Sequence, residues 1–193
     1  MDGNGTLDLY VATYKKRNAL DAYSPQARAM DQTVTKVNGK YQVVDAWKQE
    51  YRIEERQDLG GIARSQRAEV DLFFLNDGHG QFTRVPVTGP RFLNEDGSPV
   101  TTAPDFFTLA ARFYDVNGDG APDLYVCNDF EDPDQFWIND GKGNFRLTPA
   151  LSVRETSNTC MSVDFADVNR DGHVDLFTTD MLSATLAERQ RQV

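Results

Sequence analysis

The sequence predicts an all-β fold built from repeated short antiparallel strands. An acidic pattern, Asp-x-Asn-x-Asp-Gly-x-x-Asp, occurs at residues 115–123 and 167–175, and an apolar run follows each copy. A second pattern, Asn-Asp-Gly-x-Gly, occurs at residues 76–80 and 139–143. Gly and Asn tolerate the positive φ angles of tight turns, so both patterns predict hairpin connections. About four short strands per ~50 residues indicate a propeller blade. We therefore expect a partial β-propeller of about three to four four-stranded blades with calcium-binding hairpin loops.

The spacing of the acidic loops predicts how the blades follow one another. The loops end at Asp123 and Asp175, and the same step back from Asp123 reaches Asp71, at the start of an apolar run. On this alignment, residues 64–69 (RSQRAE) replace the acidic loop of that blade. A further copy at residues 2–9 lacks the first position of the pattern, so the chain is expected to begin within a motif. Residues 1–193 are therefore interpreted as one partial propeller, a fragment of a longer chain that supplies the remaining blades.

Several segments depart from the repeat. Residues 15–67 are interpreted as an insertion, in which residues 34–44 predict a hairpin around Asn38-Gly39 and residues 46–57 a short helix. Residues 89–105 are rich in turn formers and predict a loop. The tail at residues 183–193 is expected to form a short helix.

Composition limits the classes of partner. The formal net charge is −10, which does not suit a nucleic-acid or anionic-membrane binder. No apolar run approaches the roughly 20 residues that span a bilayer, so no membrane span is expected. The two cysteines, Cys127 and Cys160, do not make a disulfide scaffold in a chain of this length; they either pair or remain buried free thiols.

The acidic loops carry the oxygen ligands that a hard cation prefers. Alternate spacing lets a curled backbone direct side-chain oxygens inward from positions 1, 3, 5 and 9 and a carbonyl oxygen from position 7. Several carboxylates without His or Cys side-chain ligands suit Ca²⁺, which takes six to eight oxygens. The expected ligands are Asp115, Asn117, Asp119, the carbonyl of Ala121 and Asp123; Asp167, Asn169, Asp171, the carbonyl of His173 and Asp175; and, in the truncated loop, Asp2, Asn4, the carbonyl of Thr6 and Asp8.

Two other interpretations of these loops fit the residues less well. An EF-hand needs Glu at position 12, where this chain has Val126 and Thr178, and flanking helices rather than strands. Asp and Asn also make good turns without metal. However, three carboxylates within nine residues repel one another, and a plain turn does not need them.

The blade sequences resemble a known repeat family. Residues 115–130, 134–145 and 161–182 are similar to the FG-GAP/VCBS repeats of integrin-α-like propellers, and most similar to the bacterial cartilage-acidic-protein-like (ASPIC/UnbV-associated) group. The resemblance covers about two-thirds of the chain and weakens over residues 15–67. It implies a secreted or cell-surface bacterial propeller within a longer protein, and it names no ligand.

Catalytic residues are not evident in the sequence. The two histidines lie in a glycine-rich turn and in an acidic loop, and neither cysteine has an obvious His partner. The acidic residues Asp129, Glu131, Asp132 and Asp134 are interpreted as a solvated turn around Pro133; the alternatives are an extension of a metal site or a contact with a partner on one face of the propeller. The aromatics Tyr125, Phe130, Phe136 and Trp137 are interpreted as core between blades rather than a carbohydrate platform.

We therefore expect a non-catalytic, calcium-stabilised extracellular module that binds protein or glycan partners. The alternative is part of a propeller enzyme, polysaccharide lyase-like, whose active site lies outside this segment.

Overall fold

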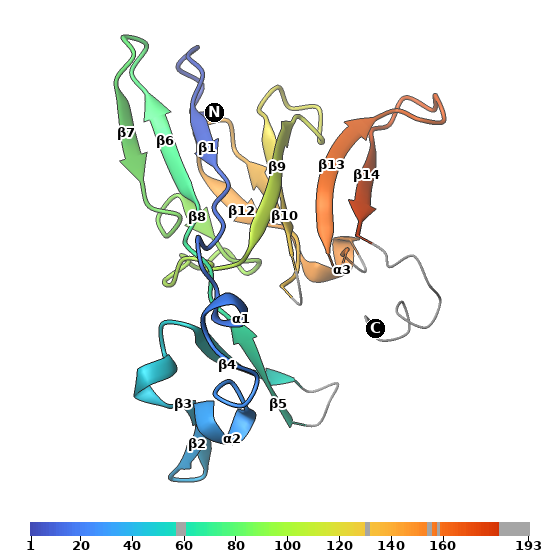
Figure 1. Ribbon diagram of the computed structural model, residues 1–193. Helices are drawn as coiled ribbons and strands as arrows, with labels where there is room; N and C mark the ends of the chain where they lie inside the picture. Colours follow the sequence, from blue (N-terminus) through green and yellow to red (C-terminus); the bar gives the residue numbers. More distant parts are fainter. Residues whose placement is uncertain (57–60, 130–131, 154–155, 158, 182–193) are drawn as a thin grey trace.

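The computed structural model describes residues 1–56, 61–129, 132–153, 156–157 and 159–181, and its mostly β architecture agrees with the predicted all-β class. The strands form several separate sheets, and none of the sheets in these residues is closed. Three sheets stand side by side, and the segment between β1 and β6 forms a smaller body at the opposite end of the molecule from the acidic loops (Figure 1).

The first of the three sheets, called the first unit, has three antiparallel strands in the order β1-β6-β7. Its strands are β1 (Leu9–Val11), β6 (Leu72–Asn76) and β7 (Phe82–Val85). The truncated acidic loop precedes β1, and the first Asn-Asp-Gly turn joins β6 to β7.

The second unit has five strands in the order β8-β12-β11-β10-β9, antiparallel except for the β8–β12 pair. The complete acidic loop at 115–123 joins β9 to β10, and the second Asn-Asp-Gly turn joins β11 to β12. Its strands are β8 (Phe92–Leu93), β9 (Thr108–Tyr114), β10 (Asp123–Asn128), β11 (Gln135–Asn139) and β12 (Phe145–Leu147), and helix α3 (Ala150–Val153) follows.

The third unit is the hairpin of β13 (Cys160–Ala166) and β14 (Asp175–Asp180), joined by the second complete acidic loop. The strand that precedes the acidic loop therefore pairs with the strand that follows it in both units, as the sequence predicts. The tail at 183–193 lies outside the described residues.

Strand register corrects the alignment of Asp71. In the first unit Tyr10 pairs with Phe73, and in the second Tyr125 pairs with Phe136, so β1 is equivalent to β10 and β6 to β11. Asp71 therefore corresponds to Asp134, not to Asp123. The prediction that residues 64–69 replace an acidic loop is wrong, because the residues between β1 and β6 are inserted between two paired strands of one unit.

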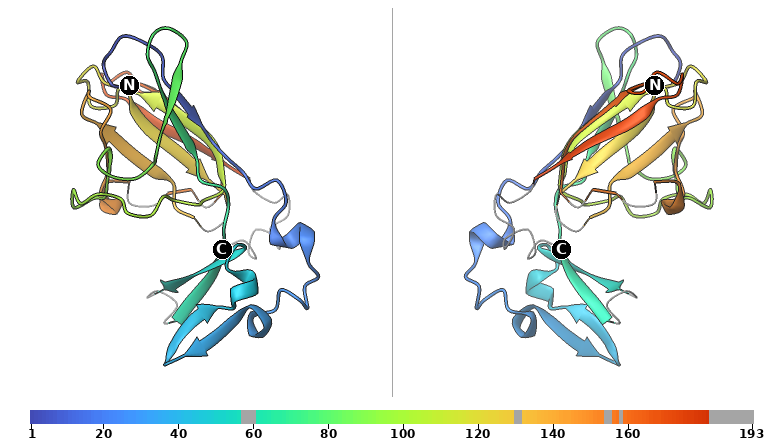
Figure 2. Two further views of the ribbon diagram at one scale, coloured as in Figure 1. Left: turned by 90° about the vertical axis from the view of Figure 1, so that its left-hand side faces the viewer. Right: turned by 90° about the vertical axis from the view of Figure 1, so that its right-hand side faces the viewer.

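The insertion folds into two hairpins and short helices. Its hairpin at 34–44 is confirmed, with φ of 49° at Asn38 and 81° at Gly39 in the turn. Figure 2 shows these elements gathered beneath the three units. They are α1 (Ala19–Ala22), α2 (Met30–Thr33), β2 (Val34–Val37), β3 (Lys40–Val43), the 3₁₀ turn η1 (Asp45–Trp47), β4 (Tyr51–Arg56) and β5 (Gly61–Gln66).

The helix predicted over residues 46–57 is wrong. Among its described residues, 46–56, only the part within η1 is helical, and Tyr51–Arg56 pairs with β5 along its length. Tyr51 and Ile53, two residues apart, pack into the cluster that includes Ala19 and Val43. This spacing places both side chains on one face of a strand, and pairing with β5 overrides the local preference.

Successive side chains of β10 in the second unit face two different core clusters. Leu124 and Val126 of β10 face a cluster shared with the first unit, which includes Phe73 and Phe145. Tyr125 and Cys127 face the opposite side, toward the third unit. Tyr125, Phe136 and Trp137 therefore lie between units as predicted, whereas Phe130 lies outside the described residues. The predicted loop at 89–105 is confirmed apart from β8, although Phe92 and Val100 are buried within it.

The acidic cluster around Pro133 is not solvated, which corrects the sequence interpretation. Asp129, Asp132 and Asp134 are all buried, whereas Glu131 lies outside the described residues. Asp132 contacts Arg52 of the insertion, and Asp134 accepts hydrogen bonds within the second unit. The sequence pattern resembled a turn, but tertiary contacts supply these carboxylates with donors. No helix among the described residues is long and apolar enough to cross a membrane.

Candidate metal-binding loops

The loop at 115–123 is organised by its own carboxylate and amide side chains. Both oxygens of Asp115 accept backbone N–H bonds, from Gly118 at 2.9 Å and Gly120 at 2.9 Å, and Asp119 donates its backbone N–H to Asp115 at 3.1 Å. Gly118 and Gly120 have φ of 76° and 86°, which favour glycine and let the chain fold around Asp115. The acidic positions are therefore held on the inside of one tight curl.

Asp123 connects this loop to the sheet. Its carboxylate accepts one bond from Val116 N–H at 3.0 Å and another from Asn139 N–H at 2.8 Å, where β11 ends. The residue is only 1% exposed. Burial raises the pKa of Asp123 although these two N–H groups act in the opposite direction. The ninth position of the loop is thus an anchor as well as a candidate ligand.

The loop at 167–175 repeats this arrangement. Asp167 accepts from the N–H of Asp171 at 3.1 Å and of Gly172 at 2.9 Å, and Asp175 accepts from Val168 N–H at 2.9 Å. Arg170, with φ of 63°, stands where the first loop has Gly118. The geometry therefore persists even where a left-handed residue is not glycine.

The truncated loop keeps the contacts of positions 2 to 9. Asn4 N–H donates to Asp2 at 3.2 Å, Thr6 N–H donates to Asn4 Oδ1 at 2.8 Å, and the Met1 amino group pairs with Asp8. Asp8 also accepts from Asn76 N–H at 2.9 Å, as Asp123 does from the equivalent Asn139. The structure therefore places Asp2, Asn4 and Asp8 at positions 3, 5 and 9.

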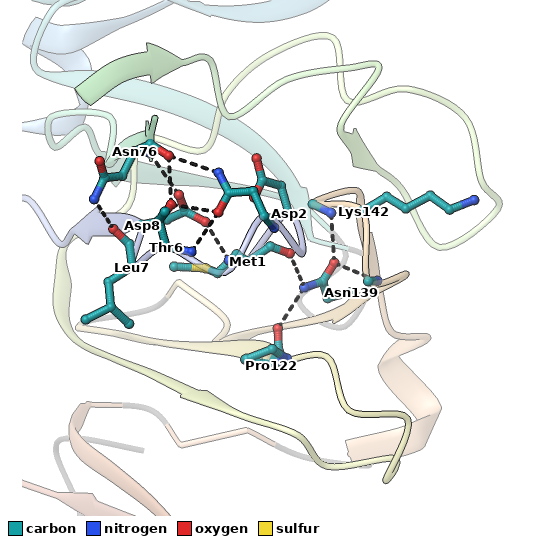
Figure 3. A network of polar contacts seen from close by, with 12 residues as sticks. Met1, Asp2, Thr6, Leu7, Asp8, Asn76, Pro122, Asn139 and Lys142 are labelled. Carbon is teal, nitrogen blue, oxygen red and sulfur yellow. Dashed lines mark hydrogen bonds and ion pairs between the residues drawn. The ribbon is translucent and has the colours of Figure 1, made fainter. Parts of the chain in front are cut away.

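The truncated loop also contacts the second unit. Asn139 Nδ2 donates to the carbonyl of Met1 at 3.0 Å and to the carbonyl of Pro122 at 3.0 Å, so one side chain joins two acidic loops (Figure 3). All three acidic loops lie at the end of the molecule away from the insertion (Figure 1). The repeat therefore gathers its acidic loops at one end of the molecule.

The donor set of the two complete loops fits calcium. Each offers Asp, Asn and Asp side chains at positions 1, 3 and 5, a backbone carbonyl at position 7 from Ala121 or His173, and a carboxylate at position 9. Each carboxylate oxygen that accepts one N–H retains a second lone pair for a cation. Among the described residues, no three acidic side chains of one loop have oxygens all within 4.8 Å of one another, so a bound ion would draw them closer.

The side chain of Asp134 forms a clamp between two strands that the sequence does not predict. It accepts from Tyr125 OH at 2.9 Å and from Asn128 N–H at 2.8 Å, which ties β10 to the start of β11. In the first unit Asp71 makes the same bonds with Tyr10 OH at 2.6 Å and Thr13 N–H at 2.7 Å. Aligning the Asn-Asp-Gly turns instead of the acidic loops would have revealed this equivalence.

Burial of the Asp134 clamp predicts a pH-dependent stability. Burial raises the pKa of Asp134 to about 6, above the value of about 3.9 in an unfolded chain. The folded state therefore keeps a proton that the unfolded state has lost. This contribution is full below the unfolded pKa and is lost as pH rises through about 6. We expect denaturant unfolding in EDTA to show stability falling over this range, with a shallower fall in Asp134→Asn.

The control for this pH dependence is Asp96→Asn. Hydrogen bonds from Ser98 hold the pKa of the exposed Asp96 carboxyl below its usual value, so this group does not titrate between pH about 4 and 6. The variant should keep the wild-type slope over that range. An equally steep slope in Asp134→Asn and in the wild type would contradict the assignment.

Comparison with known proteins supports the repeat. Residues 115–178 match the family of FG-GAP-like repeats. The matched segment runs from the first complete acidic loop through the second and into β14. No curated protein and no solved structure is significantly similar to the chain.

Proposed function

We propose that this chain is part of a calcium-stabilised extracellular β-propeller that acts as a non-catalytic binding or scaffold module. The proposal rests on one observation. The same acidic loop geometry occurs three times, each time at the same end of one of three adjoining units. The FG-GAP-like repeat supports a propeller-like binding or scaffold role at the level of the family. Membership of the ASPIC/UnbV-associated group is part of the proposal.

The outer faces of the first and third units support further blades. Phe82 of the first unit is 48% exposed, and the equivalent Phe145 of the second is fully buried between units. Phe177 of the third unit is 63% exposed, and the equivalent Tyr125 is 1% exposed. In each pair the aromatic side chain is buried in the second unit and exposed at the equivalent position of an outer unit. This difference fits a stack of units that continues on both sides.

Calcium would act on stability. In the loops it would neutralise the clustered carboxylates and join the two strands that each loop connects. Protein or glycan partners are proposed to bind the exposed loops, which a calcium-rich extracellular medium would hold in one shape. Extracellular calcium sites have dissociation constants of about 10⁻⁴ to 10⁻³ M, which suits that setting.

Thermal and denaturant unfolding with calcium, magnesium or chelator tests this proposal. At about 10 mM free calcium each site should add about 1.4 to 2.7 kcal/mol, and magnesium should add less. Asp119→Ala and Asp171→Ala each remove the position-5 carboxylate of one loop and should remove much of that loop's gain. Asp77→Ala, which changes an acidic residue of a turn outside the loops, should keep the full gain.

Absence of a calcium effect in the wild type, or an undiminished effect in both loop variants, would contradict the assigned ligands. A glycan array and a pull-down from the native cell surface then identify the partner class. Turnover of a polysaccharide by the chain within its longer protein would instead favour the enzyme interpretation.

A further inference from the structure

The boundary between the first and second units is joined by a buried hydrogen bond. Thr108 Oγ1, at the start of β9, donates to Asp71 at 2.7 Å and also lies 3.1 Å from Asn128 Oδ1. Asp71 already holds β1 to β6, so this bond attaches the clamp of the first unit to β9 of the second. Ala12 occupies the position after Val11, beside this clamp.

The boundary between the second and third units has the same clamp but different neighbours. Cys160 takes the place of Thr108. Each is the first residue of its strand, and in each strand pair its partner lies just beyond a register shift. Cys127 takes the place of Ala12, because Val126 is equivalent to Val11. The first boundary therefore has Asp71, Thr108 and Ala12 where the second has Asp134, Cys160 and Cys127.

The two cysteines at this boundary are brought together and bonded. Cys127 and Cys160 form a disulfide, with a Cα–Cα distance of 5.0 Å and no solvent exposure at either residue. An oxygen of Asp134 and the two sulfurs all lie within 4.8 Å of one another. The bond runs between β10 and β13, which belong to different units.

We propose that Cys127 and Cys160 are an oxidative cross-linking site that fastens the third unit to the second, in place of the hydrogen bond used at the first boundary. This inference does not depend on calcium. A disulfide closing 33 residues restricts the unfolded chain, so it stabilises the junction more than one hydrogen bond does. Such a bond persists in an oxidising compartment, as proposed for the whole protein.

The chemistry of formation is thiol–disulfide exchange with a small-molecule disulfide or a protein disulfide. One cysteine thiolate attacks the oxidant's disulfide and displaces one thiol, and the other cysteine then attacks the mixed disulfide and displaces the second. The two cysteines lose two protons and two electrons, and the oxidant leaves as two thiols. Because both sulfurs are buried in the folded chain, the bond forms while the third unit folds against the second.

The reduced form has a defined alternative. A Cys160 thiol would occupy the position from which Thr108 donates to Asp71, so in the reduced chain we expect it to donate to Asp134. Reduction should therefore weaken the junction without unfolding the units. Because a reduced thiol could make this hydrogen bond, the test replaces both cysteines with the two residues found at the first boundary.

The experiment compares the wild type with the double variant Cys127→Ala, Cys160→Thr, which copies Ala12 and Thr108 onto the second boundary. Free thiols are counted in denaturant, and melting temperatures are measured with and without reductant at saturating calcium and again in EDTA. We expect no free thiol in the oxidised wild type and a fall of about 10 °C on reduction. The double variant should have a lower melting temperature than the oxidised wild type, and reductant should not change it.

Three results would overturn the proposal. The first is two free thiols in protein purified without reductant, and the second is a melting temperature that reduction leaves unchanged. The third is a reduced wild type that gains stability from zinc and loses it to chelator, which would make the cysteines and Asp134 a metal site. Failure of the double variant to fold leaves the wild-type thiol count and reduction shift as the deciding measurements. A calcium response absent from every sample would overturn the calcium proposal and leave this one intact.

Discussion

Phe73→Ala is expected to cost about 3 to 5 kcal/mol of folding stability. Phe73 belongs to β6 of the first unit and is fully buried. Its ring packs edge-on against Phe92, with centroids 5.9 Å apart, and against Phe145, with centroids 5.7 Å apart, both from the second unit. Removing the ring therefore opens a cavity at the junction of two units. Denaturant unfolding should show a lower midpoint, and thermal melting should fall by about 10 °C.

The matched control for Phe73 is Phe177→Ala, which deletes the same side chain from an exposed position. Phe177 is 63% exposed at the outer face of the third unit, so its loss should change stability by no more than about 0.5 kcal/mol. Equal losses in the two variants would mean that the junction of the first and second units is not the principal core. A small loss in Phe73→Ala alone would have the same meaning.

Arg52→Ala is expected to release the insertion from the repeat units at a cost of about 3 kcal/mol at neutral pH. The guanidinium of Arg52 contacts Asp132 of the second unit and lies 3.4 Å from Asp105, and its side chain is only 12% exposed. It also stacks over the ring of Phe106, 5.0 Å from the centroid. The variant would leave the buried Asp132 carboxylate without its cation, which costs more stability than removing both partners, whereas Asp105 would keep its ion pair with Arg67.

The cost of Arg52→Ala should depend on pH. Burial raises the pKa of Asp132 to about 7 even with Arg52 in place, and removing the cation raises it further. At pH about 5 Asp132 is then protonated and needs no partner, so the variant should lose less stability there than at pH about 8. Limited proteolysis and hydrogen exchange over residues 15–67 should show earlier cleavage and faster exchange in the variant than in the wild type at the same pH, and this difference should be larger at the higher pH.

Lys48→Ala is the control for Arg52→Ala. Lys48 pairs with Asp45 at 2.7 Å, but the two side chains are 57% and 93% exposed, so the pair adds little. This variant should leave both stability and proteolysis of the insertion unchanged. An Arg52→Ala protein with wild-type stability at every pH would show that the insertion is held to the units by other contacts.

The local features of this fold could be predicted from the sequence. The acidic loops and the Asn-Asp-Gly turns are visible because their Gly, Asn and Asp residues are needed within a few positions of one another. Strands after each loop were visible as short apolar runs. For the same reason the candidate ligands from Asp115 to Asp123 lie on one curl of the chain, where the spacing alone places them.

Features that depend on distant residues were predicted less well. A fixed step along the chain paired Asp71 with Asp123, and strand register instead pairs it with Asp134 because the insertion lengthens the first unit. The sequence pattern of acidic residues around Pro133 predicts a solvated turn. Their burial depends on Arg52 and Tyr125, which no local pattern connects to them.

The sequence by itself determined the all-β class, the repeated acidic loops and the hairpin turns, because each rests on backbone preferences and charges within about ten residues. Only the tertiary structure decided that the insertion interrupts one unit and that Cys127 meets Cys160. It also decided that Asp71 and Asp134 are clamps. Those outcomes depend on which strands pair and which units adjoin, and side chains far apart in the chain settle both through burial.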